Sequence, residues 1–82
     1  MGARKRFSEF DDMTAGEFAE LIKNCKLSSL EKEVATRYII WHMSDVEVGA
    51  EADRDRRTVA RWMDSIILPE LRRVRERMRC IV

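Results

Sequence analysis

The chain contains few of the residues that interrupt helices, cross-link a polypeptide or bind metals. Its 82 residues include one proline, three glycines, two cysteines and one histidine. Because so little of the chain disfavours helical structure, we expect helices to dominate. Cys25 and Cys80 are far apart in the sequence, and neither they nor His42 have partners at ligand spacing. The sequence therefore predicts free thiols and no metal site.

The patterns of membrane proteins and of most enzymes are also absent. No apolar run reaches the length of about 18 residues that a membrane helix needs, and the first residues lack an apolar signal core. We therefore expect a cytoplasmic protein without a membrane partner. The chain has no nucleophile motif and no glycine-rich phosphate loop. Since a catalytic cleft is hard to build from so short a helical chain, we expect a non-enzyme that needs no cofactor.

Acidic and basic side chains nearly cancel, but they are unevenly distributed. The formal net charge is +1. Residues 1–53 carry seven basic and eleven acidic side chains, a net charge of −4, whereas residues 54–82 carry nine basic and four acidic ones, a net charge of +5. Every basic residue of the second part is arginine. Such a concentration of positive charge favours nucleic-acid binding, although arginine-rich helices can also serve solubility alone.

Apolar spacing and capping signals divide the chain into helices. Residues 15–24 and 28–42 each follow a capping box and repeat apolar residues with a helical period. Residues 44–67 hold two further short helices. A last helix is expected from Pro69 onward, with a break or kink near Leu68, because proline fits the first turn of a helix but not its interior.

The most informative segment is residues 44–63, SDVEVGAEADRDRRTVARWM. Ser44 begins a capping box, and Asp55 is a favoured N-cap for the second of two short helices. Gly49 is expected where these helices approach closely, and Asp53 is expected to take the left-handed conformation of the turn. This is the pattern of a helix-turn-helix, which commonly places its second helix in the DNA major groove.

Together these patterns predict an all-α fold, a compact bundle of about five helices that contains a helix-turn-helix. Residues 13–82 form this single domain. Residues 1–12 are expected to be a flexible basic arm, because the cluster Arg-Lys-Arg at residues 4–6 opens it. Phe7 and Phe10 are able to anchor part of this arm to the core.

Residues 44–63 resemble the helix-turn-helix of the fourth conserved region of bacterial sigma factors and of the related phage-encoded late transcription activators. Those proteins often precede the motif with a helix of the form L-x-x-L-E-x-E-V that ends in an aromatic residue. Residues 27–34, LSSLEKEV, with Tyr38 and Trp41 beyond them, match that helix as well. The resemblance covers less than half of the chain.

The resemblance implies that the helix beginning at Arg56 enters the major groove. It also implies that DNA is touched by the residues at four matching positions: Arg56, Arg57, Thr58 and Arg61. Two positions depart from the family pattern, since Asp53 replaces the usual turn glycine and Arg54 replaces the small apolar residue that follows it. Arg54 would either lay its stem along the surface or contact a phosphate of its own.

We therefore expect a small sequence-specific DNA-binding transcriptional regulator of bacterial or phage origin. Arg57 and Arg61 would reach base edges, where arginine pairs well with guanine. The remaining candidate contacts are to phosphates, from Arg54, Arg56, Thr58, Arg72 and Arg73. The partners would be double-stranded DNA and, as the resemblance implies, RNA polymerase. A homodimer through the C-terminal helix is a further possibility, because Leu71, Val74, Met78 and Ile81 have coiled-coil spacing over less than two heptads.

The alternative is a helix-turn-helix scaffold that acts as a protein–protein interaction module, or as an inhibitor of a host enzyme, without binding DNA. Acidic side chains near the expected DNA surface favour it: Asp53, Asp55 and Asp64. A third interpretation, an accessory subunit of DNA packaging or replication, predicts a large ring in solution.

Overall fold

The computed structural model describes residues 7–80, apart from the side chains of Ser8 and Cys80. These residues form helices and no strand, so the expected all-α class is confirmed. A short 3-10 helix, η1 (Ser8–Phe10), is followed by α1 (Ala15–Lys23), α2 (Ser29–Ile39), α3 (Asp45–Ala52), α4 (Arg56–Trp62), a π-helical turn η2 (Met63–Ile67) and α5 (Leu68–Cys80). The basic cluster at residues 4–6 and the Cys80 thiol lie outside the described part.

Reciprocal capping boxes fix the start of three helices, as the sequence predicts. In each box a hydroxyl accepts from the third backbone N–H of the helix, while a glutamate at that position accepts from the cap residue's own N–H. The three pairs are Thr14 with Glu17, Ser28 with Glu31, and Ser44 with Glu47. These contacts satisfy backbone donors that a helix start leaves without partners.

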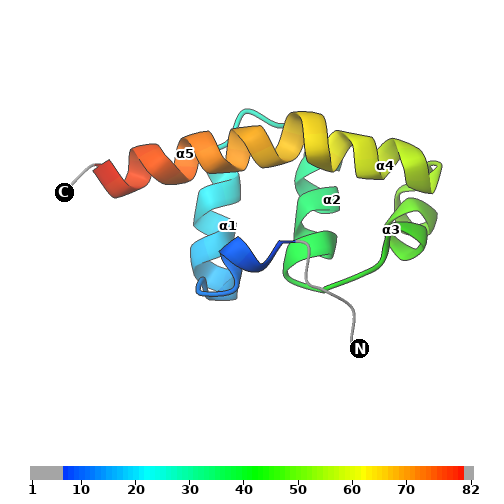
Figure 1. The fold of residues 1–82 in the computed structure, drawn as a ribbon, viewed down its shortest axis with the longest axis horizontal. Helices are drawn as coiled ribbons and strands as arrows, with labels where there is room; N and C mark the ends of the chain where they lie inside the picture. Colours follow the sequence, from blue (N-terminus) through cyan, green and yellow to red (C-terminus); the bar gives the residue numbers. More distant parts are fainter. Residues whose placement is uncertain (1–6, 81–82) are drawn as a thin grey trace.

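The chain does not break near Leu68, since α4, η2 and α5 run on as one rod, and the expected irregularity takes the form of the π-helical turn η2 (Figure 1). The backbone N–H of Leu68 donates to the carbonyl of Met63, five residues back, so the turn before Pro69 is widened. A widened turn accommodates a proline, which offers no N–H and crowds the carbonyl four residues earlier. Apart from the short η1, residues 7–80 therefore form four separate helices where about five were expected.

The rod spans the long dimension of the protein, and the other helices pack along it. Its 25 residues extend over about 37 Å at 1.5 Å per residue, against a longest extent of 39 Å. Figure 1 shows α1 and α2 side by side beneath the rod, with α3 against its α4 end. The core between them is built from apolar residues of every helix, including Phe18, Leu21, Val34, Val48, Val59, Met63, Ile67 and Leu71.

Helical spacing alone predicts that Trp41 and Ile66 belong to the buried stripes of their helices, but both side chains lie at the surface. Trp41 is 67% exposed, because α2 ends at Ile39 and the chain turns through His42, whose φ is 54°. Ile66 is 42% exposed, because the wide turn of η2 rotates it away from the core while Ile67 stays buried. Spacing alone assumes a regular helix, and neither position lies in one.

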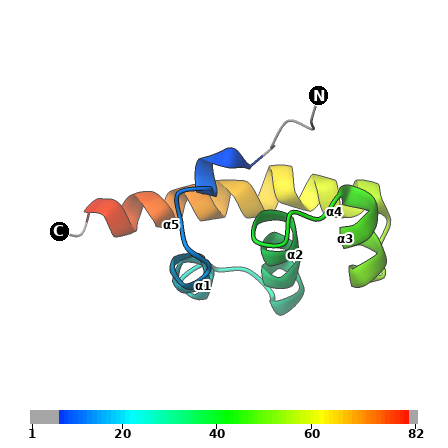
Figure 2. The same cartoon turned by 90° about the horizontal axis from the view of Figure 1, so that it is seen from below.

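Residues 7–12, expected to belong to a flexible arm, instead pack against α5 (Figure 2). Phe10 is 2% exposed and contacts the ring of Phe18 edge-on, with 6.0 Å between ring centroids. The guanidinium of Arg75 lies over the Phe10 ring, 5.4 Å from its centroid, and donates from Nη2 to both carboxylate oxygens of Asp12 at 2.8 and 3.0 Å. The packed domain therefore includes residues before position 13.

Candidate functional site

The turn between α3 and α4 has the geometry that the sequence predicts. Asp53 is left-handed, with φ 56° and ψ 45°, and the N–H of Arg54 donates to the Gly49 carbonyl at 2.9 Å. This hydrogen bond satisfies a carbonyl that the end of α3 would otherwise leave without a donor. Asp55 then caps α4, because its Oδ1 accepts from the N–H of Arg57 at 2.7 Å. The turn is therefore fixed by backbone and cap hydrogen bonds on both sides.

Gly49 is the point at which α3 and the start of α4 come closest. A Cβ atom placed on Gly49 would lie 2.8 Å from the carbonyl oxygen of Arg54, 3.1 Å from the nitrogen of Arg56 and 3.2 Å from its Cα. All three atoms belong to the backbone, so no side-chain rotation relieves the contact. The crossing of α3 and α4 consequently depends on the absence of a side chain at position 49.

Three arginines of α4 extend from this crossing into solvent. Arg56, Arg57 and Arg61 are exposed, and within residues 7–80 none of them forms an ion pair. Arg57 and Arg61 are four residues apart on the side of the helix opposite the buried Val59 and Met63. No acceptor among residues 7–80 occupies their guanidinium groups, whose donors suit planar acceptors such as phosphates, carboxylates and base edges.

Two other residues of the predicted set lie beside this group. Thr58 is half-buried on α4. The guanidinium of Arg54 folds back on the turn, where Nη1 donates to the carbonyls of Asp53 at 3.1 Å and Ala52 at 3.5 Å. Arg54 is exposed, so these carbonyl bonds compete with water and are readily exchanged for another acceptor.

The two predicted residues on α5 are not part of the same group. Arg72 donates from Nε and Nη2 to the carboxylate of Glu9 at 3.0 and 2.9 Å. Arg73 does the same to Glu70, at 3.0 and 2.8 Å. Arg72 lies 11 positions beyond Arg61 and 15 beyond Arg57, so it stands about 16 to 22 Å along the rod from these arginines.

These ion pairs shift the titration of both carboxyl groups. The hydrogen bond from Arg72 holds the pKa of Glu9 below its ordinary value, more strongly than partial burial raises it. The pKa of Glu70 falls to about 2, because Arg73 and the backbone N–H of Lys26, at 2.7 Å, both donate to its carboxylate. Arg72 and Arg73 thus have internal anionic partners, whereas the α4 arginines have none among residues 7–80.

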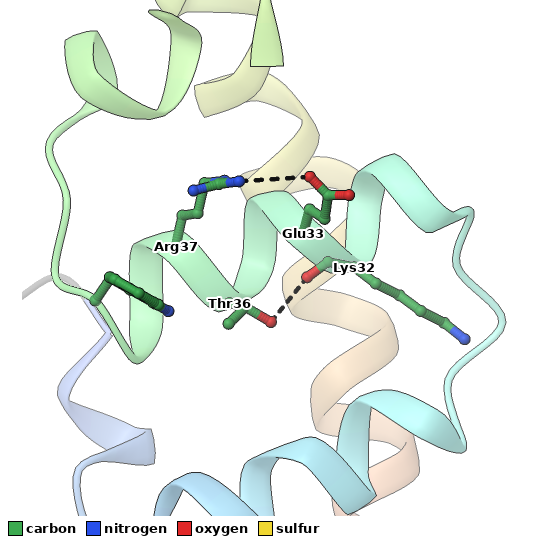
Figure 3. A pocket seen from close by; sticks show the side chains of 5 residues that line it. Lys32, Glu33, Thr36 and Arg37 are labelled. Carbon is green, nitrogen blue, oxygen red and sulfur yellow. Dashed lines mark hydrogen bonds and ion pairs between the residues drawn. The ribbon is translucent and has the colours of Figure 1, made fainter. Parts of the chain in front are cut away.

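A hollow on α2 is lined by Lys32, Glu33, Thr36, Arg37 and Trp41. Figure 3 shows Arg37 turned toward Glu33, with 3.6 Å between Nη2 and Oε1, and Lys32 extended away from both. Arg37 also reaches Glu51 of α3, at 3.7 Å. These charges join α2 to α3, and the residues that line the hollow include one carboxylate and no histidine or cysteine.

Elsewhere the described residues hold no group of three or more His, Cys, Asp or Glu side chains arranged to bind a metal. Cys25 is buried, its Sγ donates to the Leu21 carbonyl at 3.2 Å, and burial raises the pKa of the thiol to about 11. A thiol with such a pKa is protonated at neutral pH and is a poor nucleophile. None of the helices in the described range is both long enough and apolar enough to cross a bilayer.

Val46 and Trp41 are surface features that sequence spacing did not select as site residues. Val46, on the first turn of α3, is 57% exposed. A signal for it exists, because it precedes the buried Val48 by two residues, which places the two on opposite sides of a helix. For Trp41 the signal would be the exact end of α2, which sequence does not define well.

No protein-family model matches the chain, and no curated protein or solved structure is significantly similar to it. Any functional assignment therefore depends on the chain's own residues and geometry.

Proposed function

We propose that α3 and α4 form a helix-turn-helix and that the protein is a small sequence-specific DNA-binding transcriptional regulator. The observation that carries the proposal is the row of exposed arginines on α4, which have no acidic partner among residues 7–80. The close crossing at Gly49 supports it as well, because it holds α4 in one orientation relative to the rest of the domain.

In this proposal α4 lies in the major groove of duplex DNA. Arg57 and Arg61 donate to the O6 and N7 acceptors of guanines, the commonest specific contact that arginine makes with DNA. Arg56 and Thr58 contact phosphates, and Arg54 exchanges its bonds to the turn carbonyls for a bond to a phosphate. No reaction is catalysed and no cofactor takes part.

Arg72 and Arg73 have a secondary role in this proposal. Each would need to exchange a carboxylate for a phosphate, and such an exchange gives little net electrostatic gain. Arg72 and its partner Glu9 are both substantially exposed, at 57% and 39% of their side-chain surface, so Arg72 is the easier of the two to exchange. Any phosphate contact from α5 is therefore weaker than those from α4.

A single domain of this size makes few DNA contacts and needs a second anchor. The described part of the α5 stripe offers little to a homodimer, because Leu71 and Val74 are buried in the chain's own core and Met78 is its one exposed member, while Ile81 lies outside the described residues. We therefore favour RNA polymerase as the second anchor over a dimer formed through α5. Within the proposal, polymerase follows from the resemblance of residues 44–63 to sigma-factor and phage-activator domains.

The proposal is tested by titrating the protein against random duplex DNA at low and moderate salt. Binding should be measurable at about 50 mM salt and should weaken steeply by about 200 mM, since arginines displace counterions from phosphates. The double variant Arg57→Ala with Arg61→Ala should lose about tenfold or more in affinity for a selected site. Arg77→Ala with Arg79→Ala removes the same charge from the far end of α5 and is the matched control.

Two results would overturn the proposal: no binding at the lower salt, or equal losses in the two double variants. Either result would favour the alternative, a helix-turn-helix scaffold that binds a protein. One specific observation supports that alternative, namely the exposure of Trp41, a residue type enriched at protein interfaces. Replacing Trp41 with alanine should leave DNA binding unchanged if the primary proposal is correct.

A further inference from the structure

A surface hollow lies between the first turn of α3 and the outer side of α4. It is lined by Ser44, Asp45, Val46, Arg56, Arg57 and Ala60. Its volume is about 390 Å³. The hollow therefore adjoins the arginines of the proposed DNA-binding surface but draws part of its wall from a different helix.

The hollow combines two kinds of chemistry. Val46 and Ala60 contribute methyl groups, and Val46 is one of the few large apolar side chains that the described surface exposes. Arg57, on the next face, contributes a guanidinium that forms no ion pair within the described range. Asp45 is the one acidic member, and it is half-buried and accepts a hydrogen bond from the hydroxyl of Tyr38 at 2.6 Å.

A ligand that matches this arrangement carries a methyl group next to a pair of hydrogen-bond acceptors. In the major groove, thymine presents a C5 methyl group and guanine presents the acceptors O6 and N7. A thymine that neighbours a guanine thus offers both features side by side. Contact between a valine side chain and a thymine methyl group removes apolar surface of both from water, which is favourable. Such a contact gives a reason for an exposed valine at position 46.

We propose that Val46, together with Ala60, reads the methyl group of a thymine that neighbours the guanine contacted by Arg57. The inference rests on the proposed function and adds the base preference of the site. It assigns specificity to a residue of α3, the helix that otherwise only supports α4.

The test begins with a binding site selected from random duplex DNA by the intact protein. Each thymine of that site is then replaced singly by deoxyuridine, which lacks only the C5 methyl group. The guanine contacted by Arg57 is the one whose replacement no longer weakens binding in the Arg57→Ala variant. For the intact protein, deoxyuridine at the thymine next to that guanine should weaken binding about three- to fivefold, which is the value of one buried methyl group. In Val46→Ala the same replacement should change affinity less than about twofold.

Ile66→Ala is the matched control, because Ile66 is an exposed apolar residue like Val46 but lies on η2 and does not line the hollow. It should keep the full response to deoxyuridine. Specific binding that is indifferent to deoxyuridine at every thymine would overturn the inference and leave the proposed function standing. A Val46→Ala variant that still loses three- to fivefold in affinity on the deoxyuridine replacement would likewise overturn the inference. Failure to bind DNA at all would overturn both.

Discussion

Replacing Gly49 with alanine tests whether the crossing of α3 and α4 depends on a missing side chain. The added Cβ would meet the Arg54 carbonyl oxygen at 2.8 Å, well inside the separation of about 3.5 Å at which carbon atoms normally pack. Two further backbone atoms of Arg56 lie within 3.2 Å. The start of α4 must therefore move away from α3, and the hydrogen bond from Arg54 to the Gly49 carbonyl moves with it.

The expected cost is the difference between two opposing effects. Overpacking against a rigid backbone costs about 1–3 kcal/mol, and the contact at Gly49 belongs to the upper part of this range because no side chain can yield. Alanine recovers up to about 1 kcal/mol through its higher helix propensity. We therefore expect a net destabilisation of about 1–2 kcal/mol. For a domain of this size that corresponds to a melting temperature lower by about 4–16 °C.

Gly16 provides the matched control within the same chain. A Cβ at Gly16 would have one neighbour, the Thr14 Oγ1 atom at 3.9 Å, an ordinary contact. Gly16→Ala should therefore stabilise the protein by about 0.5–1 kcal/mol through backbone entropy alone. Urea and thermal unfolding followed by far-UV circular dichroism measure both variants. If Gly49→Ala were stabilised to the same degree as Gly16→Ala, the close approach of α3 and α4 would be refuted.

Two further predictions concern the contacts that join distant parts of the chain. Phe10→Ala should destabilise the protein by about 3 kcal/mol, because it empties a buried aromatic site; an unchanged urea midpoint would show that η1 is not part of the core. Glu70→Gln should cost about 1 kcal/mol near pH 6, because hydrogen bonds to a charged group contribute about 1.5–3 kcal/mol and solvent screens this partly exposed pair. The pKa of Glu70 is lowered to about 2, so its contribution is complete above its ordinary pKa of 4.5 and is lost as the pH falls toward 2. Urea midpoints of wild type and variant should therefore converge between pH 5 and pH 2, and a constant difference over this interval would contradict the assignment.

The sequence by itself determined the local features of the proposed site. Ser44 and Asp55 cap α3 and α4, Asp53 takes the left-handed conformation, and Gly49 lies at the close approach. Each of these features depends on residues within about seven positions of one another. Hydrogen bonds and steric contacts over such short separations are set by the order of residue types, so they can be inferred without knowing the rest of the fold.

Only the tertiary structure decided which arginines are paired and which apolar residues are buried. Arg72 finds Glu9 across 63 positions of sequence, and Phe10 enters the core although acidic residues surround it in the sequence. The wide turn before Pro69 changes the helical phase and exposes Ile66. How the helices pack as a whole decides which distant segments come into contact and where the helical period changes. The local spacing of residues does not determine that packing, so these features could not be inferred from it.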